Sequence, residues 1–105
     1  MFAASDWAET SVETVRLSER LPEGPVDFLK LDVEGAELVV LSELEASGAL
    51  ARIEQVALEV HPLGPAHLPA VLDVLVRAGF RHRVAVVNDR FWDDSQLLLV
   101  DAFRD

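Results

Sequence analysis

The sequence predicts an α/β fold in which a three-layer, mostly parallel sheet follows the order β-α-β-α-β-β and ends in an antiparallel hairpin. Short apolar runs alternate with segments of helical periodicity, which is the pattern of right-handed crossovers between parallel strands. The 105 residues, half of them apolar, provide one packed core, and neither a repeat nor a long linker divides them. We therefore expect a single domain over residues 1–105, with residues 1–11 irregular.

Two segments have the composition of buried strands. Val26–Val33 is apolar apart from Asp27 and Lys30, as in a central strand that helices cover on both faces. Gln55–Val60 forms the second strand and is followed by a proline-containing loop. Val12–Leu17 carries β-branched residues and is a candidate for an additional strand ahead of them.

Two helices are expected between these strands and the hairpin. The first covers residues 36–46, and the second covers His67–Ala78, where apolar side chains recur at i, i+3, i+4 and i+7. Gly48 and Gly79 follow the two helices as residues that tolerate the positive φ of a helix end. In the first helix, the residues expected to face the sheet are Val40, Leu41 and Leu44, and those expected to face solvent are Glu37, Glu43 and Glu45.

The last two apolar runs, Val84–Val87 and Leu97–Val100, predict the closing hairpin. A polar loop over residues 88–95 separates them. Phe91 and Trp92 in this loop either line the mouth of a substrate site or cover the edge of the sheet.

The composition excludes several classes of protein. The formal net charge is −10, with 9 Lys+Arg against 19 Asp+Glu, so no basic stripe is available for nucleic-acid phosphates or an anionic membrane. The absence of cysteine excludes disulfides and thiolate zinc sites. Because the apolar runs are too short to span a bilayer and no basic and apolar leader opens the chain, we expect a soluble cytoplasmic domain.

The negative charge is concentrated in the first part of the chain. Residues 1–60 contain 13 acids and 4 bases, whereas residues 61–105 contain 6 acids and 5 bases. These acids either keep the surfaces of helices soluble or lie together in a functional site. The positions of the strand ends distinguish these two interpretations.

Several of these acids follow the ends of two predicted strands, where ligands bind in open α/β sheets. Asp32 and Glu34 follow the first strand, and Glu59 and His61 end the second. A spacing of two residues places the members of each pair on one side of an extended chain. If the two strands are neighbours, three carboxylates and an imidazole meet in one polar cleft.

Three interpretations of this cleft stay open. In the first, Asp32, Glu34 and Glu59 are catalytic carboxylates, with Lys30 as a counter-ion for them. In the second, the three carboxylates and His61 are ligands of Mg²⁺ or Mn²⁺. In the third, the acids only serve the turn and the helix dipole, and the domain binds a partner through an exposed sheet edge.

The run Pro25–Leu38, with the sequence PVDFLKLDVEGAEL, resembles the signature of the FkbM family of methyltransferases. In that family an apolar strand ends in Leu-Lys-Ile/Leu-Asp-Val-Glu-Gly-Ala-Glu and opens a helix. Ala57–His61, with the sequence ALEVH, is similar to the family's next strand, and Thr14–Leu17 is similar to the segment before the signature. The resemblance covers residues 12 to about 62.

This resemblance implies an S-adenosylmethionine-dependent enzyme with a Rossmann-like class I fold, of which the chain holds the C-terminal half. It implies methyl transfer to a hydroxyl group of a small metabolite or sugar. Asp32 would then be the acceptor-side base or orienting carboxylate, and Glu34 and Glu59 would shape the cleft. Asp32, Lys30 and Gly35 would contact the cofactor.

Part of the family pattern has no counterpart in these residues. The Asp-x-Gly-Ala-Asn-x-Gly loop, which holds the amino-acid end of the cofactor, is absent, as is the acidic residue that holds the ribose. We expect both in a segment upstream of Met1. The chain is then part of a longer enzyme, a split or shortened product that pairs with a complementing segment or with itself, or a remnant with another use.

Overall fold

The structure, a computed structural model, describes residues 16–33, 35–61, 64–87 and 97–105. It contains two α-helices, α1 (Glu37–Ser47) and α2 (His67–Arg77). Two short 3₁₀ helices accompany them, η1 (Leu17–Glu19) and η2 (Ala49–Arg52). Neither α-helix of the described residues is long and apolar enough to cross a membrane.

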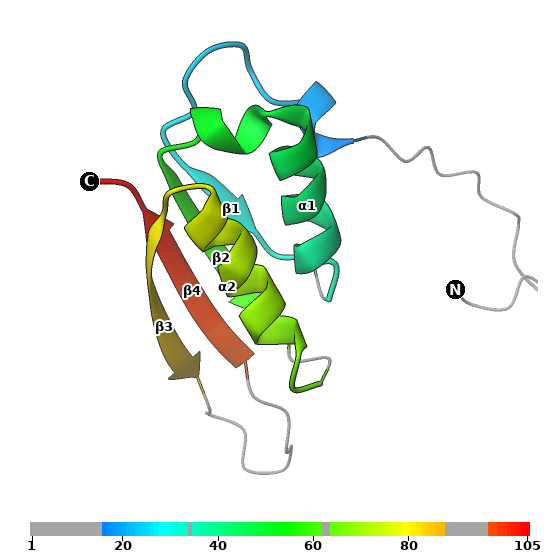
Figure 1. Ribbon diagram of the computed structural model, residues 1–105, viewed down its shortest axis with the longest axis vertical. Coiled ribbons are helices and arrows are strands. Elements are labelled where there is room, and N and C mark those ends of the chain that lie inside the picture. Colours follow the sequence, from blue (N-terminus) through cyan, green and yellow to red (C-terminus); the bar gives the residue numbers. More distant parts are fainter. Residues whose placement is uncertain (1–15, 34, 62–63, 88–96) are drawn as a thin grey trace, which may run out of the picture.

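Four strands form one mixed sheet in the order β1-β2-β4-β3 (Figure 1). The strands are β1 (Leu29–Leu31), β2 (Gln55–Val60), β3 (Arg81–Val87) and β4 (Leu97–Phe103). β1 and β2 are parallel, and β4 is antiparallel to both of its neighbours, β2 and β3. The α/β class and the antiparallel closing hairpin are therefore confirmed, and β1 and β2 end at the same edge of the sheet.

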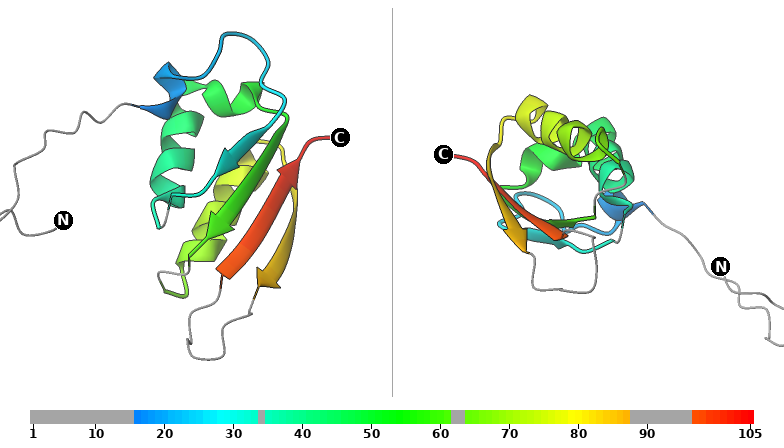
Figure 2. Two further views of the ribbon diagram at one scale, coloured as in Figure 1. Left: turned by 180° about the vertical axis from the view of Figure 1, so that it is seen from behind. Right: turned by 90° about the horizontal axis from the view of Figure 1, so that it is seen from below.

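Both α-helices cover the same face of the sheet (Figure 2). In β2, every second residue is therefore buried. Val56, Leu58 and Val60 are at most 2% exposed, whereas the residues that alternate with them are partly exposed. No helix of the described part lies on the opposite face, which we call the open face. The described residues thus form two layers, and the predicted third layer is not confirmed.

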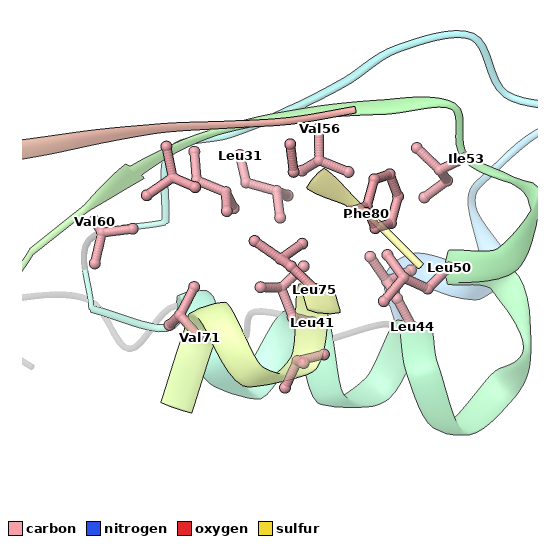
Figure 3. Close-up of a cluster of buried hydrophobic side chains, with 14 of the residues drawn as sticks. Leu31, Leu41, Leu44, Leu50, Ile53, Val56, Val60, Val71, Leu75 and Phe80 are labelled. Carbon is pink, nitrogen blue, oxygen red and sulfur yellow. The ribbon is translucent and has the colours of Figure 1, made fainter. Parts of the chain in front are cut away.

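The core fills the space between the sheet and the two helices (Figure 3). Leu41 and Leu44 of α1 and Leu75 of α2 are completely buried there, and burying each such side chain contributes about 1.5–3 kcal/mol. The helices and the sheet therefore hold each other in place, and this packing fixes the position of the strand ends that carry the site.

The predicted helix ends agree with the structure. Gly48 ends α1 with φ of 82°, and Gly79 follows α2 with φ of 90°, a conformation that costs glycine little because it has no Cβ. The backbone N–H of Phe80 donates to the carbonyl oxygen of Leu75 at 3.0 Å, and Phe80 is buried against the core.

Arg104 joins the end of β4 to the rest of the fold. Its guanidinium donates hydrogen bonds to the carbonyl oxygens of Ile53, Leu50 and Ala78, at 2.9, 3.0 and 2.5 Å. It also lies over the ring of Phe80, 4.0 Å from the centroid. This one side chain satisfies carbonyl groups at the ends of η2 and α2, which the sequence pattern does not reveal.

The structure changes the limits of several predicted strands. Val26–Val33 forms a strand only at β1, together with an isolated bridge between Val26 and Ile53, and Phe28 is 52% exposed because the chain bends before β1. The predicted strand over residues 12–17 is wrong at its end, because Leu17 begins η1, and its first four residues lie outside the described residues.

The hairpin strands are longer than predicted, because cross-strand pairing extends from Arg81↔Phe103 to Val87↔Leu97. The loop between them, with Phe91 and Trp92, lies outside the described residues.

Candidate functional site

The candidate site lies where β1 and β2 end. The parallel register pairs Leu31 with Leu58, so the residues that follow these two leave the sheet at the same edge. Asp32 is exposed just beyond β1, and Glu34 lies outside the described residues. Gly35 has φ of 95° in the turn that leads into α1. As expected, Asp32 follows β1 at the edge where β2 also ends.

Glu59 and Lys30 belong to the open face. They line a shallow hollow of about 320 Å³ over β1, β2 and β4. The hollow is lined by Lys30, Ala57, Leu58, Glu59, Leu99, Val100 and Asp101. Glu59, one of the acids for which Lys30 was expected to be a counter-ion, lines the same hollow, and the counter-ion role stays a prediction.

The most unusual group at this edge is Glu37, the first residue of α1, which is completely buried. Its Oε1 accepts a hydrogen bond from the backbone N–H of His61 at 2.7 Å. Nδ1 of His61 lies 3.7 Å from the same oxygen, and Nε2 of His67 lies 3.8 Å from it. We call these three side chains the Glu37 cluster.

Among the residues that the structure describes, three buried polar atoms of the Glu37 cluster have no hydrogen-bond partner: Oε2 of Glu37, Nδ1 of His61 and Nε2 of His67. Most buried polar groups in proteins are paired, so three unpaired atoms in one place require an explanation. The ring of His67 is nearly buried, with 8% of the side chain exposed, whereas that of His61 is 38% exposed. The cluster therefore reaches solvent through His61.

Burial raises the pKa of Glu37, but opposing interactions lower it below its ordinary value. The nearby backbone N–H groups of His61, Glu37 and Gly35 and the charge of His67 favour the anion, and the N–H of His61 donates to Oε1 at 2.7 Å. Glu37 is consequently an anion at neutral pH even though water does not reach it.

The prediction that Glu37 faces solvent is wrong. The turn after β1 is short, with the N–H of Ala36 donating to the carbonyl oxygen of Val33 at 3.0 Å, and it directs the first residue of α1 toward the end of β2. His67, to which the sequence assigned no role, begins α2 beside it. The sequence did contain one indication of this cluster. Glu37 and His67 each begin a helix and His61 follows a strand, so all three lie where the chain reverses direction.

Among the residues that the structure describes, no group of three His, Asp or Glu side chains is placed to hold a metal ion. Glu59 faces the hollow on the open face, whereas the imidazole of His61 approaches Glu37. The predicted set of Asp32, Glu59 and His61 is therefore not assembled as metal ligands. The fourth member of that set, Glu34, lies outside the described residues.

A second hollow, of about 360 Å³, lies beside β1 and α1. Its walls are mainly aliphatic, and Arg16 and Glu43 carry the charged groups. Glu43 is held by Ser18, whose backbone N–H and hydroxyl donate to its two oxygens at 2.9 and 2.7 Å. The lining residues are Arg16, Leu17, Leu31, Val33, Val39, Val40 and Glu43. The hollow can contain the apolar part of a small molecule next to the end of β1.

The residues assigned to the cofactor by resemblance can be compared with the polar groups of S-adenosylmethionine. The exposed carboxylate of Asp32 can accept hydrogen bonds from a hydroxyl or amino group, and the ammonium group of Lys30 can bind a carboxylate. Gly35, with its positive φ, allows the backbone to approach a ligand closely. Groups of these kinds can pair with the polar atoms of the cofactor.

The fold and the site define an α/β protein whose ionisable residues gather where open sheets bind small molecules. Residues 4–82 match the family model described as the methyltransferase FkbM domain. The chain therefore belongs to the FkbM methyltransferase family, as the Asp-Val-Glu-Gly-Ala-Glu run indicated, and at the level of the family its activity is methyl transfer. Comparison with curated proteins and with solved structures gave no match.

Proposed function

We propose that the chain contributes the acceptor side of a methyl-transfer site and methylates a hydroxyl group of a small metabolite or sugar, with S-adenosylmethionine as the methyl donor. The match to the methyltransferase FkbM domain carries this proposal. The acceptor would bind at the shared end of β1 and β2, beside Asp32 and the Glu37 cluster.

The chemistry at this edge suits a hydroxyl acceptor. Methyl transfer to oxygen requires alignment of the acceptor and removal of its proton. Asp32 is exposed and can accept a hydrogen bond from the acceptor hydroxyl, which orients the oxygen. The aliphatic hollow next to β1 can hold the carbon skeleton of the acceptor.

S-adenosylmethionine, when bound, supplies an electrophilic methyl group on a sulfonium sulfur. Asp32, Lys30 and Gly35 are the residues of this chain that would hold its polar groups. Glu59 lines the hollow that contains Lys30 and would hold the ammonium side chain in position. The two described acids of the predicted site then have different roles, because Asp32 contacts the ligand and Glu59 supports Lys30.

The proposal is tested with labelled S-adenosylmethionine. The chain is incubated with methyl-labelled cofactor and a panel of small alcohols, sugars, amines and carboxylic acids, and products are identified by mass spectrometry. We expect label in hydroxyl acceptors only, and Asp32→Asn should reduce turnover about 10²-fold, which is the order of loss that a misplaced reacting group causes. Label in amines or carboxylic acids alone would contradict the hydroxyl assignment.

Asp27→Asn is the matched control, because Asp27 is also exposed but precedes β1 instead of following it. It removes the same charge at the other end of the strand. We expect unchanged turnover for this variant. Calorimetry with S-adenosylmethionine measures binding separately from turnover, and a chain that neither binds the cofactor nor transfers its methyl group would overturn the proposal.

A further inference from the structure

The proposed function gives no chemical role to the side chains of the Glu37 cluster. A buried carboxylate has two oxygens that require donors, and two imidazoles face it with nitrogen atoms that lack a partner. The gaps of 3.7 and 3.8 Å are too short for an intervening water, so the groups interact directly. Both distances are measured to Oε1, the oxygen that also accepts from the backbone N–H of His61, and both are longer than a hydrogen bond, so the interaction is electrostatic.

This arrangement determines where the protons lie. A neutral imidazole has a proton on one ring nitrogen and a lone pair on the other, and the hydrogen bond of one nitrogen sets the role of the other. The negative charge of Glu37 favours an N–H over a lone pair on the nitrogen that faces it, which is Nδ1 in His61 and Nε2 in His67. The lone pair of His61 is then on Nε2, and the side chain is 38% exposed although its Nδ1 is buried.

We propose that His61 is the general base that accepts the proton of the acceptor hydroxyl, and that Glu37 is the positioning residue that holds His61 in the Nδ1–H form. This inference rests on the proposed function. His61 follows β2 directly, at the same sheet edge as Asp32, so both residues can contact one acceptor. Asp32 would orient the hydroxyl, and His61 would remove its proton.

The step balances in atoms and charge. The acceptor O–H bond breaks, and its proton moves to Nε2 of His61. The oxygen forms a bond to the methyl carbon as the carbon–sulfur bond of the sulfonium donor breaks, which leaves a neutral thioether. The positive charge lost by the sulfur appears on the imidazolium of His61, where the Glu37 carboxylate stabilises it.

The first test requires no turnover. Histidine labelled with ¹⁵N reports its tautomer through the coupling of ring carbon-bound protons to the two nitrogens. We expect the Nδ1–H form for His61 and the Nε2–H form for His67, with His82 as a reference in the same spectrum because it lies on β3, away from the cluster. An Nε2–H form of His61 would overturn the proposal.

The second test uses methyl transfer. His61→Asn keeps the backbone N–H that donates to Glu37 but removes the base, so turnover should fall about 10²-fold or more, with unchanged calorimetric affinity for the cofactor. Glu37→Gln should lower turnover and change the tautomer of His61 together, and His82→Asn should change neither. If Glu37 only stabilised the fold, Glu37→Gln would lower the melting temperature without changing the tautomer of His61.

The outcomes separate this inference from the proposed function. Methyl transfer that persists in His61→Asn overturns the base and leaves the proposed function intact. If no hydroxyl acceptor is methylated by the wild-type chain, the proposed function and the base are overturned together, whatever the tautomer. Loss of turnover in His61→Asn, together with the Nδ1–H form in the wild type, supports both parts of the inference.

Discussion

Each end of the sheet holds a charged side chain, the partly buried Arg104 at one end and the completely buried Glu37 at the other, and the two differ in how their polar atoms are paired. At one end the guanidinium of Arg104 donates to three carbonyl oxygens and lies on the ring of Phe80. At the other end one oxygen of the Glu37 carboxylate and two imidazole nitrogens beside it have no hydrogen-bond partner within the described part of the chain. Unpaired buried groups reduce stability, so we infer from this difference that Arg104 serves the fold and Glu37 serves chemistry.

The directions of the strands explain why the two ends differ in role. β4 runs antiparallel to β2, so Arg104 at the end of β4 lies beside the start of β2, where the N–H of residue 104 donates to the carbonyl oxygen of Glu54 at 3.2 Å. The Glu37 cluster lies at the opposite edge, where β1 and β2 both end. In open α/β sheets this second edge is the one that binds ligands.

The largest effect on stability is expected for Arg104→Met. The change keeps the apolar stem but leaves three carbonyl groups without a donor, and each buried unpaired group costs about 1–3 kcal/mol. We expect the free energy of unfolding to fall by about 3 kcal/mol, measured by urea denaturation.

Arg81→Met is the control for Arg104→Met. Arg81 pairs with Asp105 at 2.8 Å, and both side chains are mostly exposed, so this pair contributes little. Equal losses in the two variants would show that the hydrogen bonds of Arg104 do not stabilise the fold more than an exposed ion pair does.

A smaller and pH-dependent effect is expected for Glu37→Gln. Because the pKa of Glu37 is lowered in the folded state, its contribution to stability is complete above its ordinary value of about 4.3. That contribution is lost as the pH falls through the lower folded pKa. We expect Glu37→Gln to lose about 1 kcal/mol at pH 7, because an amide is a weaker acceptor than a carboxylate, and to lose less stability than the wild type between about pH 5 and 3.

Urea denaturation at about pH 7, 5, 4 and 3 measures this effect. Glu45→Gln is the matched control on the same helix, since Glu45 also has a lowered pKa, but through an exposed ion pair with Arg77. Its loss should depend on salt concentration, whereas that of Glu37→Gln should not. A pH profile of Glu37→Gln that parallels the wild type would contradict a charged, buried Glu37.

Local patterns predicted the fold better than they predicted the site. β2 was placed correctly and α1 to within one residue, because periodicity and the glycine at a helix end act over a few neighbours. Asp32 was placed at the correct edge for the same reason, since it directly follows a strand.

The contacts that distinguish the two ends of the sheet lie far apart in the sequence, and the local patterns did not reveal them. The hydrogen bond between His61 and Glu37 spans 24 residues, and that between Arg104 and Leu50 spans 54. The limits of β1 also depend on tertiary structure, because Val26 pairs with Ile53 and the chain then bends. Periodicity identifies the apolar side chains that are buried, but it does not show which charged side chain packs at the end of the core.

The smallest effect is expected from two glycine substitutions that differ in their distance from Arg104. Gly48 and Gly79 both have positive φ, of 82° and 90°, so alanine costs about 1 kcal/mol of backbone strain at either position. A Cβ at Gly48 meets nothing within 4 Å, whereas one at Gly79 would lie 3.0 Å from a guanidinium nitrogen of Arg104. Gly79→Ala should therefore cost more than Gly48→Ala by about 0.5 kcal/mol, since the guanidinium must shift from its carbonyl partners.

Urea denaturation of both variants, alone and in the Arg104→Met background, measures this difference. The double-mutant cycle isolates the coupling, because the extra cost at Gly79 should disappear once the guanidinium is gone. The cost of Gly48→Ala should be the same in both backgrounds, since the space around it is empty. If the extra cost at Gly79 persists in the Arg104→Met background, backbone strain alone is its cause. The position of the Arg104 guanidinium then does not require a glycine at residue 79.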